Sequence, residues 1–279
     1  MEAQHHFIIT PLLKFYLEHG LIVDHIHQVI EYTPQACFQG FCDNVIYHRQ
    51  LADDNPQQAI VGELHKLIGN SAYGRTLMQS EKFTNTTYGN RLKFSQLIRR
   101  HIFRDADEIT DNFYEISCSK PRVYCDQPIQ IGFFVYGYAK LRMLQFYYDF
   151  LQKYLIRSCF ELILTDTDSL YIAFARQQWI DMVKARYRPE FLRQRDNWLV
   201  PEKNAVNFYQ LKRQRGLFKL EFEGQGVIAL GPKLYIAYGW QETKRACKGV
   251  QKLHNSLRRE EFWSVLLNHT AIQGMKKPL

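Results

Sequence analysis

Hydrophobic residues in the first 80 positions recur mainly at helical spacing. The pattern predicts a helix from Pro11 to Glu18 that ends at Gly20, followed by a strand from Ile26 to Tyr32. Residues 36–80 contain two further helical stretches, separated by the turn-forming sequence Asp53-Asp54-Asn55-Pro56. We therefore expect a helical hairpin over residues 36–80.

The middle of the chain combines short apolar runs with one long helical pattern. Residues 81–125 mix Asn, Thr and Arg with short apolar runs, which predicts strands with a small insertion. Ala139 to Leu151 have the spacing of a long helix. Two apolar runs, Leu162–Thr165 and Leu170–Phe174, then flank the sequence Asp-Thr-Asp-Ser. Strand formers on both sides of turn-forming residues predict a β-hairpin.

The last part of the chain predicts more strands and a final helix. The expected strands are Leu217–Phe222, Gly226–Leu230 and Leu234–Tyr238. The expected helix, Arg258–Leu267, would place Trp263, Leu266 and Leu267 on one face. The whole pattern predicts an α+β fold in which helices pack on antiparallel strands.

The predicted hairpin places two carboxylates at its tip. Asp166 and Asp168 are two residues apart, so in extended backbone they share a face. Magnesium prefers oxygen ligands and usually keeps waters and substrate phosphates. Two such ions can clamp the attacking and leaving oxygens of phosphoryl transfer. We therefore expect Asp168 as the principal magnesium ligand with Asp166 as its partner; an ordinary acidic turn is the alternative.

A second motif, Lys66-Leu-Ile-Gly-Asn-Ser-Ala-Tyr-Gly, lies in the second predicted helix. Lys66, Asn70 and Tyr73 stand at positions i, i+4 and i+7, which is one face of a helix. A cation can meet phosphates, and an aromatic ring can lie against a sugar or base. This face therefore matches a nucleoside triphosphate. The alternative is a helix that ends at Asn70, with Lys66 solvated and Tyr73 in a core.

The two motifs in this order resemble those of the family B DNA polymerases, and most of all the branch found in mobile elements and protein-primed viruses. Arg49 lies where that family has a basic residue on the neighbouring fingers helix, and residues 126–151 look like its long palm helix. Lys233-Leu234-Tyr235 is similar to the KxY element that contacts the primer terminus, and Cys247-Lys248-Gly249-Val250 looks like the start of the thumb. The resemblance covers roughly residues 10–255.

This resemblance implies a DNA-directed DNA polymerase that uses two magnesium ions. It implies that Asp168 and Asp166 are catalytic, that Lys66, Asn70, Tyr73 and Arg49 bind the nucleotide, and that Lys233, Tyr235 and Lys248 bind the primer. The implied partners are a DNA primer–template and deoxynucleoside triphosphates, with a terminal protein as an alternative primer. The implied divisions are a partial palm (1–35), fingers (36–80), a connecting region (81–125), the palm with the hairpin (126–240) and the beginning of a thumb (241–279).

The chain also departs from the family pattern. The first palm motif, DxxSLYP, which supplies another catalytic Asp, has no counterpart; the nearest strings, at Asp43 and Asp111, lack its Ser-Leu-Tyr core. Leu164 stands where many relatives have Tyr, and nothing resembles a proofreading exonuclease. We therefore expect a palm–fingers fragment without synthesis of its own. The alternatives are a non-catalytic DNA- or nucleotide-binding remnant and a metal-dependent nuclease.

Composition agrees with a nucleic-acid partner. The 279 residues include 36 Lys and Arg against 28 Asp and Glu, a net charge of +8, which favours a polyanion and makes its binding salt-dependent. Six cysteines without a CxxC pair argue against a zinc site. With no recognisable signal peptide or membrane-spanning run, we expect an intracellular protein, nuclear or associated with a virus or mobile element, that is not secreted.

Overall fold

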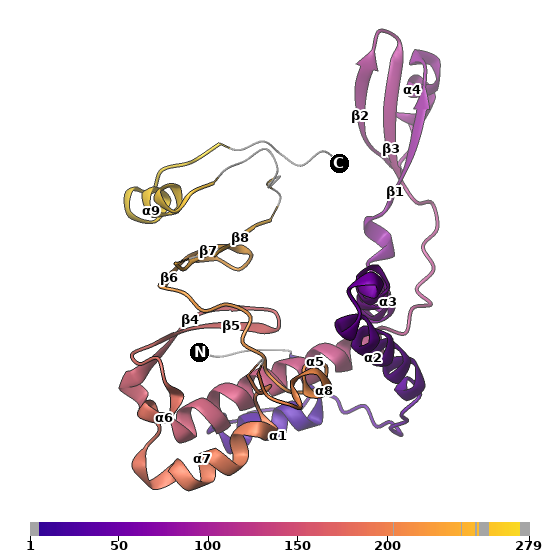
Figure 1. The fold of residues 1–279 in the computed structure, drawn as a ribbon. Coiled ribbons are helices and arrows are strands. Elements are labelled where there is room, and N and C mark those ends of the chain that lie inside the picture. The colour runs from indigo at the N-terminus through magenta and orange to yellow at the C-terminus, as the bar shows by residue number, and fades with distance from the viewer. Residues whose placement is uncertain (1–5, 203, 241, 249, 251–256, 274–279) are drawn as a thin grey trace.

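The computed structural model describes residues 6–202, 204–240, 242–248, 250 and 257–273. It combines helices with three small sheets, in which every strand pairing is antiparallel. This confirms the α+β expectation at the level of class. Figure 1 shows the β4–β5 hairpin below the β6–β7–β8 sheet, and the paired helices α2 and α3 to one side.

The first helix, α1 (Thr10–Glu18), ends as predicted at Gly20. Gly20 has φ +90°, and its amide and that of Leu21 donate to the carbonyls of Leu17 and Tyr16. This pair of hydrogen bonds is a Schellman motif, which satisfies carbonyls at the helix end. Glycine suits the position because the left-handed backbone costs it nothing.

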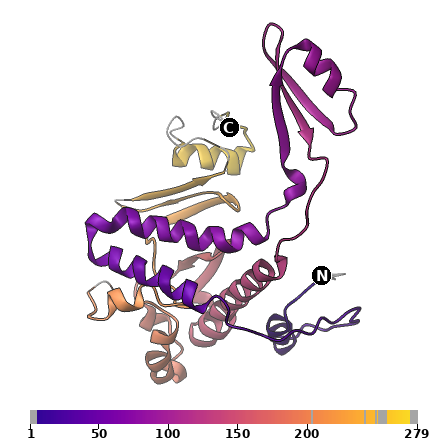
Figure 2. The ribbon, with the colours of Figure 1, turned by 90° about the vertical axis from the view of Figure 1, so that its right-hand side faces the viewer.

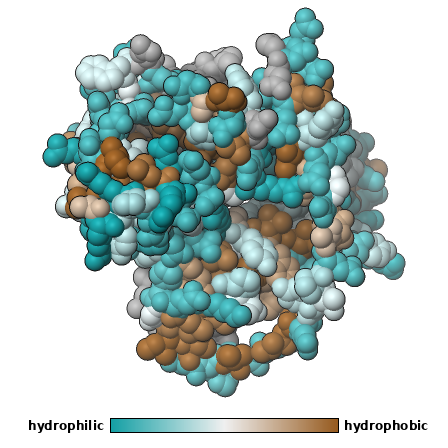
Figure 3. All heavy atoms as spheres, turned by 60° about the horizontal axis from the view of Figure 1, so that its bottom comes forward, coloured by the Kyte–Doolittle hydropathy of each residue, from teal (hydrophilic) through white to brown (hydrophobic). Residues whose placement is uncertain are grey.

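The predicted strand Ile26–Tyr32 is wrong. Residues 21–36 form no strand, and Figure 2 shows the run as an irregular loop next to α1. The apolar and aromatic residues of the segment favour a strand, but a strand forms only where a neighbour completes its hydrogen bonds. Large apolar side chains consequently stay exposed, with Ile22 at 85% and Val29 at 78%. Figure 3 shows apolar side chains gathered on the surface of the molecule.

The predicted helical hairpin is confirmed as α2 (Gln39–Asp54) and α3 (Ala59–Thr76), which pack side by side (Figure 2). The hairpin rests on α5 (Ile129–Gln145) through a close approach at Gly132. A Cβ at Gly132 would lie only 2.2 Å from the side chain of Leu77, the residue that follows α3. Glycine therefore sets how near α3 lies to α5.

Residues 84–119 form a lobe that projects from the rest of the chain (Figure 1). It contains β1 (Thr84–Gly89), α4 (Arg91–Leu97), β2 (Phe103–Thr110) and β3 (Phe113–Ser119), with the strand order β1-β3-β2. Leu97, Ile116 and Cys118 form its own small core. Strands in this region were predicted, and their presence is confirmed.

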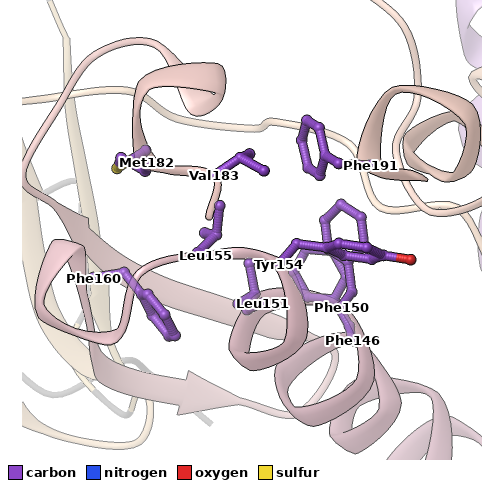
Figure 4. Close-up of a cluster of buried hydrophobic side chains, with 9 residues drawn as sticks. All are labelled: Phe146, Phe150, Leu151, Tyr154, Leu155, Phe160, Met182, Val183 and Phe191. Carbon is purple, nitrogen blue, oxygen red and sulfur yellow. The ribbon is translucent and has the colours of Figure 1, made fainter. Parts of the chain in front are cut away.

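Helix α5 and the stretch that continues it pack against several elements that come later in the chain. The helix begins at Ile129, well before the predicted start at Ala139, and continues as a π-helical stretch over Phe146–Gln152. Its end packs on α6 (Trp179–Met182), α7 (Arg188–Gln194) and the start of β4. Figure 4 shows this largest buried cluster, which comprises Phe146, Phe150, Leu151, Tyr154, Leu155, Phe160, Met182, Val183 and Phe191.

The predicted hairpin around Asp-Thr-Asp-Ser is confirmed as β4 (Phe160–Asp166) and β5 (Ser169–Phe174). The strands β6 (Gly226–Gly231) and β7 (Leu234–Tyr238) are also confirmed, and β8 (Thr243–Cys247) completes their sheet. The predicted strand Leu217–Phe222 is wrong. This segment follows the short helix α8 (Phe208–Leu211), and only Phe218 forms a bridge, to Leu199.

The final helix, α9 (Arg259–Asn268), is present, but the face predicted to be apolar is not the one that packs on the sheet. Phe262 is buried against Ile228 and Ile236 of the β6–β7–β8 sheet. Trp263 is 40% exposed and Leu267 is 66% exposed. The face toward the core is set by where the sheet lies, and the sequence of the helix alone does not contain that information. Short 3-10 turns occur at Pro56–Gln58, Ser80–Lys82, Arg157–Cys159, Ala185–Tyr187 and Arg195–Asn197.

Candidate functional site

The β4–β5 turn, Asp166–Ser169, presents the two predicted carboxylates. Asp166 pairs with Ser169 across the hairpin, which leaves Thr167 and Asp168 as the two turn residues. Thr167 has φ +58°, an uncommon backbone conformation for a β-branched residue. The Asp166 carbonyl accepts hydrogen bonds from the Asp168 amide (2.8 Å) and the Ser169 hydroxyl (3.0 Å). These bonds fix the turn, with Asp168 exposed and the Asp166 side chain only 12% exposed.

The β6–β7 turn lies directly against the β4–β5 turn. Lys233, which has φ +60°, donates from Nζ to Asp166 Oδ1 at 2.8 Å and to Thr167 Oγ1 at 3.3 Å. The hydrogen bond and charge of Asp166, together with the nearby charge of Asp168, raise the pKa of Lys233. Lys233 was predicted to contact the primer and Asp166 to bind metal, and the structure pairs these two side chains with each other.

A pair of tyrosines joins the two hairpins below their turns. Tyr171 of β5 donates its hydroxyl hydrogen to the Tyr235 hydroxyl at 2.8 Å, and both residues are buried. Burial and this hydrogen bond raise the pKa of Tyr171. Tyr235 was predicted to line the primer cleft; its hydroxyl instead faces Tyr171 inside the small core shared by the hairpins. Tyr171 was not singled out from the sequence.

Lys248 lies beside Lys233 at the same end of the β6–β7–β8 sheet. Its amide donates to the Lys233 carbonyl at 3.1 Å, and its side chain is exposed. The sheet therefore presents two neighbouring lysines next to the carboxylates of the β4–β5 turn. An exposed pair of ammonium groups is suited to phosphate, because Lys acts as a point charge for phosphate oxygens.

Helix α3 carries the predicted nucleotide face in one continuous helix. It runs on to Thr76, so Lys66, Asn70 and Tyr73 stand on successive turns of one side. Lys66 is exposed and its Nζ lies 3.4 Å from the Glu63 carboxylate. Asn70 is also exposed, whereas Tyr73 is partly buried and meets the ring of Tyr136 edge-on at 5.9 Å.

Tyr73 connects this helix face with the carboxylate turn. Burial raises the pKa of the Tyr73 phenol, and the neighbouring Tyr136 and the Asp168 carboxylate raise it further. A carboxylate opposes ionisation of a phenol only when the two groups are near each other. The charge of Asp168 therefore acts on Tyr73, although the two motifs lie far apart in the chain.

Arg49 of α2 lies in a cluster of charged groups that includes Asp53, Glu63 and Arg213. Burial and the neighbouring Arg213 lower its pKa, while Asp53 and Glu63 oppose this effect. Asp53 accepts hydrogen bonds from Lys212 Nζ at 2.8 Å and from Arg213 Nε and Nη2 at 2.7 Å each. Glu63 lies near both Arg49 and Lys66. Arg213, in the segment after α8, has a larger effect on the Arg49 pKa than Glu63 has.

The described carboxylates fit one hard cation but not a complete two-ion site. Asp166 and Asp168 supply oxygen ligands, which suits magnesium. Among the described residues no group of three or more His, Cys, Asp or Glu side chains stands ready to hold a metal. The ammonium of Lys233 already neutralises Asp166. A second ion would need a carboxylate that these residues do not provide.

Comparison of the chain with protein-family models, curated proteins and solved structures finds no match. In the described part of the chain, no helix is both long and apolar enough to cross a membrane.

Proposed function

We propose that the chain is a DNA polymerase core of the family B type. In this proposal the β4–β5 hairpin, the β6–β7–β8 sheet and α5 correspond to the palm, α2 and α3 to the fingers, and α9 to the start of a thumb. The observation that supports it most is that the Asp168 charge acts on Tyr73, where it helps to raise the pKa of the phenol. A nucleotide that spans these groups would have its sugar or base at Tyr73 and its phosphates near the carboxylates.

The residues of the region divide between nucleotide and DNA. Lys66 binds the triphosphate. It is exposed on α3, and its salt bridge with Glu63 is a weak surface pair that leaves the ammonium available to a phosphate. Asn70 lies between Lys66 and Tyr73, and Arg49 supports the helix face from α2. Lys233 and Lys248 bind phosphates of the primer strand, where they hold position but read no sequence. Magnesium bound at Asp166 and Asp168 would neutralise phosphate charge.

The incomplete set of carboxylates favours a binding function without synthesis for this chain alone. A polymerase of this class fixes two ions against the triphosphate. The described residues offer one pair of carboxylates, and one of the pair is engaged by Lys233. We therefore propose that the chain binds primer–template and nucleotide but does not extend the primer by itself. Tyr235, being buried, supports the primer site from below.

The proposal is tested by DNA binding as a function of salt. Fluorescence anisotropy of a labelled primer–template measures the affinity. The affinity should fall steeply between about 50 and 200 mM salt, because each phosphate contact releases on the order of one counterion. It should depend little on the DNA sequence. Lys248→Ala should reduce the logarithmic salt slope by about 1. The control is Lys153→Ala, which removes an exposed lysine paired with Glu190. Affinity without salt dependence would refute the proposal.

Nucleotide binding is tested separately. Lys66→Ala should weaken deoxynucleoside triphosphate binding by about 1.5–3 kcal/mol, the contribution of a charged hydrogen bond. An unchanged affinity would remove Lys66 from the site. In a primer-extension assay with magnesium and all four nucleotides, we expect no product above background. Extension that Asp168→Ala abolishes would show that another acidic residue completes the metal site.

A further inference from the structure

Lys233 holds a position beside Asp166 that a metal ion would also need. Its Nζ is 2.8 Å from Asp166 Oδ1 and 3.3 Å from Thr167 Oγ1, so two of the three ammonium donors point at the turn. The charge of Asp168 also acts on the same ammonium. A positive group therefore already lies against Asp166, one of the two carboxylates expected to bind magnesium.

The backbone around Lys233 fixes this placement. Lys233 occupies a two-residue turn between Gly231 and Leu234, with φ +60°, a conformation that few non-glycine residues adopt. Its carbonyl accepts from the Lys248 amide at 3.1 Å. Below it, the hydrogen bond between Tyr171 and Tyr235 fixes one hairpin to the other. The lysine is thus aimed at Asp166 by the fold, although its side chain is 49% exposed and can swing away.

A divalent ion on the same carboxylate oxygen would be repelled by this ammonium. Both are hard cations that compete for the lone pairs of Asp166 Oδ1, and neither is shielded by intervening protein. Release of Lys233 is therefore a condition for full metal binding at Asp166. A phosphate of bound DNA offers the released ammonium a new anionic partner.

We propose that Lys233 is a positioning residue that stands in for the metal at Asp166 and couples metal binding to DNA binding. Without DNA, the lysine competes with the ion and keeps its affinity low. With DNA bound, a phosphate draws the lysine off Asp166 and the ion binds more tightly. Because coupling between two sites is reciprocal, the ion must raise DNA affinity by the same factor. The DNA half of this inference rests on the proposed function; the competition with metal does not.

The competition is tested by binding of Mn²⁺, a paramagnetic probe for magnesium sites, measured by electron paramagnetic resonance at one pH without DNA. Lys233→Met should bind Mn²⁺ several-fold more tightly than the unaltered chain, whereas Lys233→Arg should not. Lys153→Met is the control, because it removes the same charge from an exposed pair with Glu190. Equal or weaker binding by Lys233→Met would overturn the inference, as would Mn²⁺ binding that Asp166→Asn leaves unchanged.

The coupling is tested by repeating the titration with a saturating primer–template. The unaltered chain should bind Mn²⁺ several-fold more tightly when DNA is present, and Lys233→Met should show no such gain. If the chain fails to bind DNA at all, the proposed function fails while the competition measured without DNA still stands. DNA that binds but leaves the Mn²⁺ affinity of the unaltered chain unchanged would refute the coupling.

Discussion

We expect the hydrogen bond between Tyr171 and Tyr235 to contribute most to holding the β4–β5 and β6–β7 hairpins together. Its partners are 9% and 6% exposed, and their oxygens lie 2.8 Å apart. Replacing one tyrosine by phenylalanine leaves the other hydroxyl buried without its partner. Replacing both removes the pair and leaves two apolar rings of nearly the same shape, which contact each other at 4.7 Å between centroids.

The size of the effect follows from this asymmetry. An unpaired buried hydroxyl costs about 1–3 kcal/mol, whereas exchanging both partners for apolar groups is nearly neutral. We therefore expect Tyr171→Phe and Tyr235→Phe each to destabilise the hairpins by about 1–2 kcal/mol, and the double variant by at most about 1 kcal/mol. The cycle should yield a coupling energy on the order of 1–3 kcal/mol, within the range found for contacting residues.

Native-state hydrogen exchange of the amides in β5 and β7 measures the opening free energy of the hairpins directly. Tyr124→Phe serves as the control, because Tyr124 is 73% exposed and its hydroxyl loss should stay within about 0.5 kcal/mol. If the destabilisation of the double variant equals the sum of the two single effects, the hydrogen bond does not hold the hairpins together. The hairpins would then be held by packing of the rings alone.

The other predictions concern the helical hairpin. Asp53→Asn should destabilise the chain in urea by about 2–4 kcal/mol, because it leaves the partly buried Arg213 without its carboxylate partner. Burial alone would raise the Asp53 pKa, but the bonds from Arg213 and Lys212 outweigh it and lower the pKa. The contribution of Asp53 to the free energy of unfolding is therefore present above about pH 4 and is lost as the pH falls further. The difference in stability between the unaltered chain and Asp53→Asn, measured at decreasing pH, should shrink accordingly. Gly132→Ala should cost about 1–3 kcal/mol by overpacking Leu77, whereas Gly74→Ala, with no atom within 4 Å of the added Cβ, should be neutral or stabilising; equal effects would contradict the close approach.

Much of the fold could be predicted because its elements are specified locally. The β4–β5 hairpin combines apolar strands with turn residues. Helix α1 ends at a glycine in the left-handed conformation, whose own amide and that of the next residue bond to carbonyls at the helix end. The failures depend on neighbours. Residues 26–32 have the pattern of a strand but no partner strand, while the polar β8 is a strand because β7 lies beside it.

The site was predictable as a set of residues but not as a set of contacts. Lys66, Asn70 and Tyr73 share a helix face because the spacing requires it. The left-handed turn at Lys233 breaks the alternation of the strand. For this reason Lys233 pairs with Asp166, while Tyr235 turns inward to Tyr171. Asp53 was predicted only as a turn residue; its cationic partners come from a segment far along the chain.

The most direct test of the central claim is whether the chain recognises the nucleotide that the template specifies. Anisotropy of a labelled primer–template can be measured with each of the four deoxynucleoside triphosphates in magnesium, with a chain-terminated primer. A polymerase core should bind the DNA several-fold more tightly with the nucleotide complementary to the next template base, and Lys66→Ala should remove that gain. Equal responses to all four nucleotides, or none, would contradict the assignment of the region between α3 and the β4–β5 turn to templated nucleotide binding.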